Sequence, residues 1–183
     1  MKVESNMLPL GTLAPNFELR DVVTNQMVAL DNKTPYKATV VMFLCNHCPY
    51  VKHINTALTQ LTKHYISKEI RFIAINANDV TRYPDDSPEN MRVTAQMLQY
   101  PFPYLYDETQ EVAKAYNAAC TPDFFVFDTS QILVYRGQFD DSRPGNNKEI
   151  NGSSISEALE SLIFNQPVNT NQKPSLGCNI KWK

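Results

Sequence analysis

ATVVMFLCNHCPYVKHI, residues 38–54, joins a continuous apolar run to a helical pattern through two cysteines. The run from Ala38 to Leu44 has no polar alternation, which is typical of a central strand buried on both faces. From Pro49 onward, apolar residues recur with the spacing of a helix face: Val51, Ile54, Leu58 and Leu61. Proline favours a first helical turn because its missing N–H leaves no donor unpaired there. The stretch therefore predicts a buried strand, a Cys-x-x-Cys turn and a helix.

Strand and helix patterns alternate through the rest of the chain. Residues 15–30 predict an N-terminal β-hairpin that turns at Thr24-Asn25, and Ile70–Ile75 predicts a second central strand. The remaining expected elements, in chain order, are a polar loop at 76–86, a helix capped by Ser87, a short strand at 102–106, a helix at 109–116, antiparallel strands at 124–127 and 132–135, and a last helix at 153–164. This order predicts an α/β fold, in which helices cover both faces of a mixed central sheet.

Length and composition limit the classes of protein that fit. A chain of 183 residues is long enough for one domain, expected at 1–164, followed by an extended C-terminal tail at 165–183. The 17 basic and 19 acidic residues leave a net charge of −2 without a basic patch, so no nucleic-acid partner is expected. The N-terminus has no apolar run long enough for a signal peptide or a membrane span, so we expect a cytoplasmic protein with no membrane contact.

Because a cytoplasmic compartment keeps thiols reduced, the four cysteines do not indicate structural disulfides, and Cys45 and Cys48 are candidates for catalysis or metal binding. We expect Cys45 at the start of the helix and Cys48 in its first turn, where the helix dipole stabilises a thiolate. His47 adds a second cation when it is protonated. The arrangement predicts a thiol–disulfide oxidoreductase in which Cys45 attacks and Cys48 resolves, with no bound cofactor.

Further along the chain, Cys120-Thr121-Pro122-Asp123 precedes a strand. Together with strand-Cys-x-x-Cys-helix, this motif resembles the thioredoxin superfamily, in which a cis-proline loop faces the two cysteines. The resemblance implies a cis Thr121–Pro122 peptide whose backbone pairs with the bound substrate chain, and it places Cys120 beside the site. The expected partners are a disulfide-containing protein or small-thiol substrate and a thiol electron donor.

Four longer segments narrow the resemblance: APNFELRDVVTNQMVAL, the strand before CNHCPYVKH, PFPYLYDETQEVAKAYNAACTPDFFVFD and GCNIKWK. These segments resemble the peroxiredoxin-like proteins of the AhpC/TSA family, which implies a thioredoxin-like fold and a redox role, with an antioxidant function among the possibilities. Peroxiredoxins carry Pro-x-x-x-Thr/Ser-x-x-Cys. When Cys48 is aligned with the last position, Cys45 replaces the hydroxyl residue and Val41 replaces the proline. The buried aspartate that precedes the cysteines of thioredoxin is replaced here by Thr39.

Other interpretations remain open at this point. A thiol-dependent peroxidase would use Cys45 or Cys48, although the sequence lacks the hydroxyl that orients a peroxide. A redox-regulated or metal-binding interaction module is a different class, and its candidate ligands are Cys45, Cys48, His53 and Cys120, although we expect no metal. His53 and His64 are expected on the helix surface, and Cys178 is expected to be a free, unreactive thiol in the tail.

Overall fold

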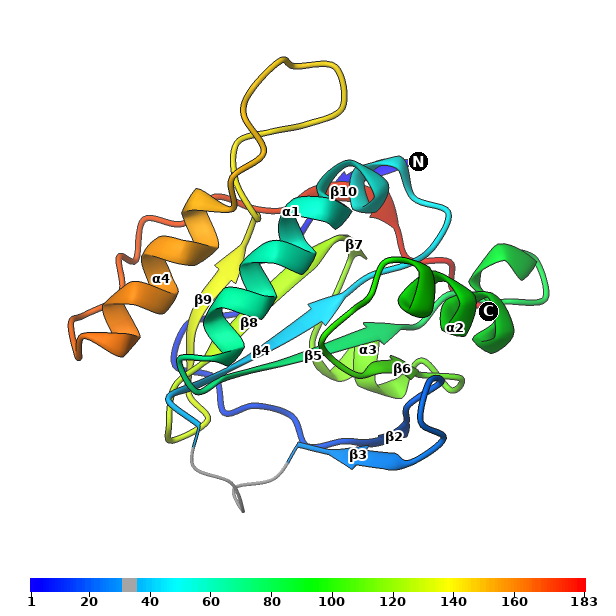
Figure 1. Cartoon of the computed structure of the whole chain (residues 1–183), viewed down its shortest axis with the longest axis horizontal. Coiled ribbons are helices and arrows are strands. Elements are labelled where there is room, and N and C mark those ends of the chain that lie inside the picture. Colours follow the sequence, from blue (N-terminus) through cyan, green and yellow to red (C-terminus); the bar gives the residue numbers. More distant parts are fainter. Residues whose placement is uncertain (31–35) are drawn as a thin grey trace.

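The computed structural model describes residues 1–30 and 36–183 (Figure 1). Its centre is a five-stranded sheet in the order β6-β5-β4-β8-β9. Strand β4 (Ala38–Phe43) pairs in parallel with β5 (Ile70–Asn76), and β5 pairs in parallel with β6 (Tyr104–Tyr106). Strand β8 (Asp123–Phe127) runs antiparallel to β4 and to β9 (Leu133–Gly137). The mixed sheet and the β8–β9 hairpin expected from the sequence are confirmed.

All six residues of β4 are buried, and their side chains point alternately to two hydrophobic cores. Helices α1 (Pro49–Ile66), α2 (Pro88–Met97) and α4 (Ser153–Ile163) pack on the core that contains Val40 and Met42. Helix α3 (Glu111–Ala115) packs on the opposite core, with Val41 and Phe43. Burial on both faces explains why the sequence of β4 is continuously apolar.

The N-terminal hairpin is confirmed as β2 (Glu18–Arg20) and β3 (Met27–Ala29), which pair antiparallel. The loop that follows β5 contains a short 3-10 helix, η1 (Pro84–Asp86), which the sequence pattern did not indicate. The side chain of Ser87 accepts a hydrogen bond from the Asn90 N–H and so caps α2, as expected. Within the described ranges, no helix combines the length and apolarity that a membrane span requires.

A second sheet was not expected from the sequence. Strands β1 (Lys2–Glu4), β10 (Leu176–Asn179) and β7 (Cys120–Thr121) form it in the order β1-β10-β7. The expectation of a tail at 165–183 therefore needs correction, because β10 is the central strand of this sheet. Gly177 permits the close approach of β10 to β7, since a Cβ atom there would meet the Thr121 carbonyl oxygen at 2.0 Å.

Helix α1 begins later than expected. Pro49 is its first residue, so the expectation of a first-turn proline is confirmed, whereas Cys48 is the N-cap and lies outside the first turn. Cys45 lies in the loop that leaves β4, three positions before the N-cap. The two cysteines were each placed too far into the helix, because the chain bends at Asn46 and His47 before the first turn of α1 begins.

Candidate active site

Three thiols meet between the N-terminus of α1 and the second sheet. The Cys48 Sγ atom lies 2.8 Å from the Cys178 Sγ atom, although 130 positions separate the two residues. Cys48 also interacts with Cys45, and this interaction shifts the pKa of both thiols. All four cysteines of the chain are free, and the exposed fraction is 2% for Cys45 and 0% for Cys48. The sequence predicted Cys45 and Cys48 as members of the site, whereas Cys178 was expected to be a free, unreactive thiol.

Cys48 is the central sulfur and the most acidic thiol of the three. Its hydrogen bond with Cys45 lowers the pKa of Cys48 to about 5, and the hydrogen bond with Cys178 acts in the same direction against the effect of burial. The same hydrogen bond to Cys48, together with burial and the charge of Asp86, raises the pKa of Cys45 well above its usual value. The reduced Cys45–Cys48 pair therefore holds one proton and one negative charge, and the charge rests on Cys48.

The loop before β8 lies against both cysteines. The peptide bond between Thr121 and Pro122 is cis. The Thr121 Oγ1 atom lies 3.0 Å from the Cys45 Sγ atom, and the Thr121 carbonyl oxygen lies 3.2 Å from the Cys48 Sγ atom. The backbone of Thr121 pairs with Cys178 of β10, so the edge that was expected to receive a substrate chain pairs with the protein's own C-terminal segment.

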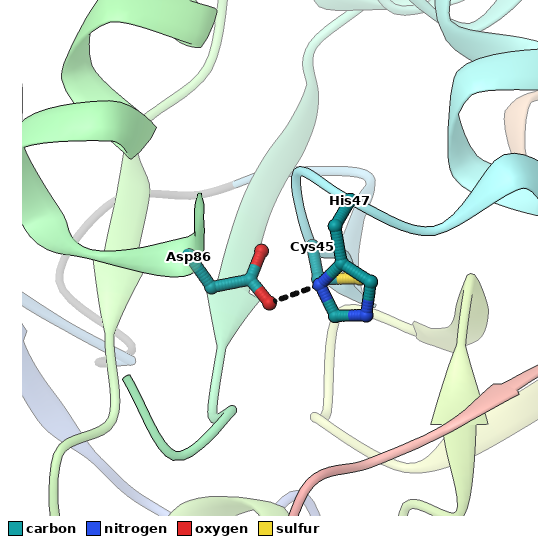
Figure 2. A group of neighbouring side chains, drawn as sticks. All are labelled: Cys45, His47 and Asp86. Atoms are coloured by element: carbon teal, nitrogen blue, oxygen red, sulfur yellow. Dashed lines mark hydrogen bonds and ion pairs between the residues drawn. The ribbon is translucent and has the colours of Figure 1, made fainter. Parts of the chain in front are cut away.

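His47 and Asp86 form an ion pair beside Cys45, which Figure 2 shows from close range. The His47 Nδ1 atom lies 2.5 Å from an Asp86 carboxylate oxygen, and the two groups lie within 4.8 Å of the Cys45 Sγ atom. The hydrogen bond to Asp86 raises the pKa of His47 in spite of its partial burial. The His47 ring also stacks on Tyr83 at a centroid distance of 5.4 Å.

Asp86 is fully buried and has several polar partners. Its carboxylate accepts hydrogen bonds from the Asn46 N–H at 2.7 Å and from the Asn78 side chain at 2.8 Å. Burial alone would raise the pKa of Asp86, but the hydrogen bonds from His47, Asn78 and Asn46 outweigh it and lower that pKa. The cation of His47 is therefore neutralised at short range, and the sequence-based picture of an isolated cation beside Cys45 is incomplete.

Asp86 is the site residue that sequence reasoning missed. It ends the polar loop that follows β5, and β5 lies parallel to β4 and in register with it. The carboxyl ends of parallel neighbours meet at one edge of a sheet, so an acidic residue in that loop was a detectable candidate for the surroundings of Cys45.

The structure separates the metal ligands proposed from the sequence. His53 makes a 3.2 Å contact with Ser142, and the Cys120 Sγ atom faces the Pro122 carbonyl oxygen at 3.6 Å. Among the described residues, the group that could offer three ligand atoms to a metal is Cys45, His47 and Asp86. In that group the imidazole and the carboxylate already bind each other. Burial raises the pKa of Cys120, which is fully buried.

Comparison with solved structures gives two close matches. A conserved uncharacterized protein from Geobacillus kaustophilus is 57% identical, with a TM-score of 0.97 over 100% of this chain and 97% of that chain. A hypothetical protein from Sinorhizobium meliloti is 42% identical, with a TM-score of 0.96 over 98% of each chain. No curated protein matches the chain.

A more distant match is the thioredoxin domain of a thiol-disulfide oxidoreductase from Bacteroides vulgatus. It is 14% identical, with a TM-score of 0.62 over 81% of this chain and 96% of that chain. This likeness identifies the fold as thioredoxin-like, as expected from the sequence. The model of the AhpC/TSA family matches residues 10–136, which include the Cys-x-x-Cys turn and the cis-proline loop. The chain therefore belongs to the AhpC/TSA family.

Proposed function

We propose that this protein is a thiol–disulfide oxidoreductase that reduces disulfides of proteins or small thiols with its Cys45–Cys48 pair. The observation that carries the proposal is the position of both thiols against the cis-proline loop, with the Cys45 Sγ atom 3.0 Å from Thr121 Oγ1 and the Cys48 Sγ atom 3.2 Å from the Thr121 carbonyl oxygen. The contact with Cys45, which lowers the pKa of Cys48 to about 5, supports the proposal. A thiolate is required for attack on a disulfide, and the lowered pKa of Cys48 favours one at neutral pH. Membership of the AhpC/TSA family supports a redox role.

The proposed reaction begins with a proton shift from Cys45 to Cys48 along their hydrogen bond. The Cys45 thiolate attacks one sulfur of the substrate disulfide, and the other sulfur leaves and takes the proton from Cys48. The Cys48 thiolate then attacks the Cys45 sulfur and releases the second substrate thiolate. Two electrons have passed to the substrate, and the Cys45–Cys48 disulfide that remains is reduced by two thiols of an electron donor.

Both residues are buried, and Cys45 is assigned the first attack because Cys48 is fully enclosed and contacts the Cys178 sulfur, whereas 2% of Cys45 is exposed. Cys48 suits the second step because its low pKa keeps it ionised for attack on the mixed disulfide. The sequence-based assignment of roles thus stays a prediction.

Trapping of mixed disulfides tests the assignment. Cys48→Ser should accumulate a mixed disulfide between Cys45 and one chain of insulin, whose disulfide it has opened, and Cys45→Ser should accumulate far less. Both variants should lose insulin reduction, whereas Cys120→Ser, a third buried thiol outside the pair, should retain it. Equal trapping by the two variants would reject the roles, and full activity of either one would reject the proposal.

A peroxidase is the competing enzymatic function, and the site favours it less. Cys45 stands where the peroxiredoxin motif has a hydroxyl residue, so the group that positions a peroxide is replaced by a thiol. A metal-binding module is the competing function from another class. Stoichiometric metal in the purified protein, together with the absence of insulin reduction, would favour that function over ours.

A further inference from the structure

Strand β10 lies where the cis-proline loop would meet a substrate chain. Cys178 pairs with Thr121 and Asn179 pairs with Cys120, both in an antiparallel register. Figure 1 shows β10 beside β7 and at the N-terminal end of α1, which is also the end that carries Cys48. Gly177 is in contact with the Thr121 carbonyl, so the backbones meet without an intervening side chain. The protein's own strand therefore presents a cysteine to the Cys-x-x-Cys turn.

The sulfur positions match this arrangement of the backbone. The Cys48 and Cys178 sulfurs are 2.8 Å apart, so a shift of less than about 1 Å would bring them to the length of a disulfide bond, about 2.05 Å. Cys48 contacts Cys45 as well, so one sulfur is shared between two candidate disulfides. A cysteine placed by chance in a surface tail would not lie within bonding reach of a fully buried active-site thiol.

We propose that Cys178 is a third redox-active thiol, which exchanges with the Cys45–Cys48 disulfide. The proposal rests on the proposed function, because that function generates this disulfide. The Cys178 sulfur attacks Cys48, a Cys48–Cys178 bond forms and the Cys45–Cys48 bond breaks. The proton of Cys178 passes to the Cys45 sulfur, which leaves as a thiol. No external oxidant or reductant takes part, since one disulfide is exchanged for another.

The exchange has a chemical consequence for Cys45. It returns Cys45 to the thiol form while the oxidising equivalent is held between Cys48 and Cys178. Cys178 must lose its proton on attack, and burial followed by the hydrogen bond to Cys48 raises its pKa to about 12, partly offset by Lys181 and the N-terminal amine. The proton is given up only during the exchange, so Cys178 is a poor nucleophile toward other disulfides and acts through its proximity to Cys48.

Peptide mapping after mild oxidation tests the proposal. The wild-type protein, Cys45→Ser, Cys45→Ser/Cys178→Ser and Cys45→Ser/Cys120→Ser are each treated with limiting oxidised glutathione. Free thiols are then alkylated under denaturing conditions and the chain is cut with trypsin. Residues 38–52 carry Cys45 and Cys48 on one peptide, and Cys178 lies on another, so a cross-link between the two peptides reports the new bond.

The cross-link is expected in wild type alongside the Cys45–Cys48 disulfide, and as the main product of Cys45→Ser. Removal of Cys178 should abolish it, and removal of Cys120 should leave it unchanged. Glutathione adducts without a cross-link, in folded Cys45→Ser and in wild type, would overturn the proposal. If Cys45→Ser fails to fold by circular dichroism, the wild-type map decides alone.

A parallel insulin assay separates this proposal from the proposed function. Normal insulin reduction by the wild type without any cross-link removes the role of Cys178 and leaves the oxidoreductase intact. A different outcome is a cross-link in a protein that neither reduces insulin nor forms a Cys45–Cys48 disulfide. That outcome supports the Cys48–Cys178 pair, but it overturns the exchange step and the proposed function.

Discussion

Replacement of His47 by alanine should make the Cys45–Cys48 pair less acidic, and the reason lies in Asp86. In the wild type, the imidazolium neutralises the Asp86 carboxylate, which lies within 4.8 Å of the Cys45 sulfur. His47→Ala leaves that carboxylate in place, and the hydrogen bonds from Asn46 and Asn78 keep it ionised. The thiolate of the pair then faces an uncompensated negative charge.

Coulomb's law gives the size of the effect. Two unit charges about 4.8 Å apart at an effective dielectric constant of about 20 interact with about 3.5 kcal/mol, or about 2.5 pKa units. The charge of Asp86 acts on Cys45, so this figure gives the order of magnitude of the rise in the pKa of Cys45 in His47→Ala. Because the thiolate is destabilised while the disulfide is unaffected, the disulfide should also become harder to reduce.

A double-mutant cycle identifies the route of the effect. Asp86→Asn removes the negative charge, so His47→Ala/Asp86→Asn should return the pKa close to that of the wild type. Asp85→Asn makes the same charge change at the exposed neighbouring position and serves as the matched control. Thiolate absorbance followed against pH, with glutathione equilibration for the potential, measures both quantities. A double variant that keeps the full shift of His47→Ala would refute the reasoning and show that the imidazolium acts on the thiolate directly.

Three further predictions concern peroxide, packing and pH. Peroxide consumption with a thiol donor should match that of a free acidic thiol, because Cys45 replaces the polarising hydroxyl, and a rate several orders of magnitude faster would contradict this. Gly177→Ala should lower the free energy of unfolding by about 1–3 kcal/mol in urea titrations, because its Cβ would meet the Thr121 carbonyl, and an unchanged value would contradict the close packing of β10. The pair of His47 and Asp86 should stabilise the wild type over Asp86→Asn between the lowered folded pKa of Asp86 and the raised folded pKa of His47. The contribution of His47 to the free energy of unfolding is complete below a pH of about 6.5 and is lost as the pH rises through its folded pKa. The contribution of Asp86 is complete above a pH of about 3.8 and is lost as the pH falls through its folded pKa. Unfolding titrations that show no such pH window would contradict the ion pair.

The sequence predicted those parts of the fold whose signals are local. The apolar run of β4, the proline at the start of α1 and the serine that caps α2 each reflect physical demands within a few residues. Cys45 and Cys48 were found for the same reason, since their spacing and position between strand and helix are visible in one short segment.

The parts that were missed depend on contacts between distant segments. Strand β10 has four residues, and its partners β1 and β7 lie at residues 2–4 and 120–121, so no periodic pattern marks it. The prolines of the C-terminal segment favoured an extended tail, and only the pairing shows that Cys178 is brought to Cys48. The role of Asp86 depends likewise on how the loop after β5 folds back toward the end of β4.

The position of β10 between β1 and β7 makes access to the thiols a matter of local unfolding. A polypeptide that is to pair with Thr121 must displace β10, and β1 then loses the strand with which it pairs. The two strands should therefore open as one cooperative unit, and their amide protons should exchange with solvent at a common rate. Since only the opened molecules can bind, the apparent affinity for a polypeptide is reduced by the fraction that is open. Under the proposed function, a small disulfide that reaches Cys45 without such opening would escape this reduction, so the sheet order would select substrates by size.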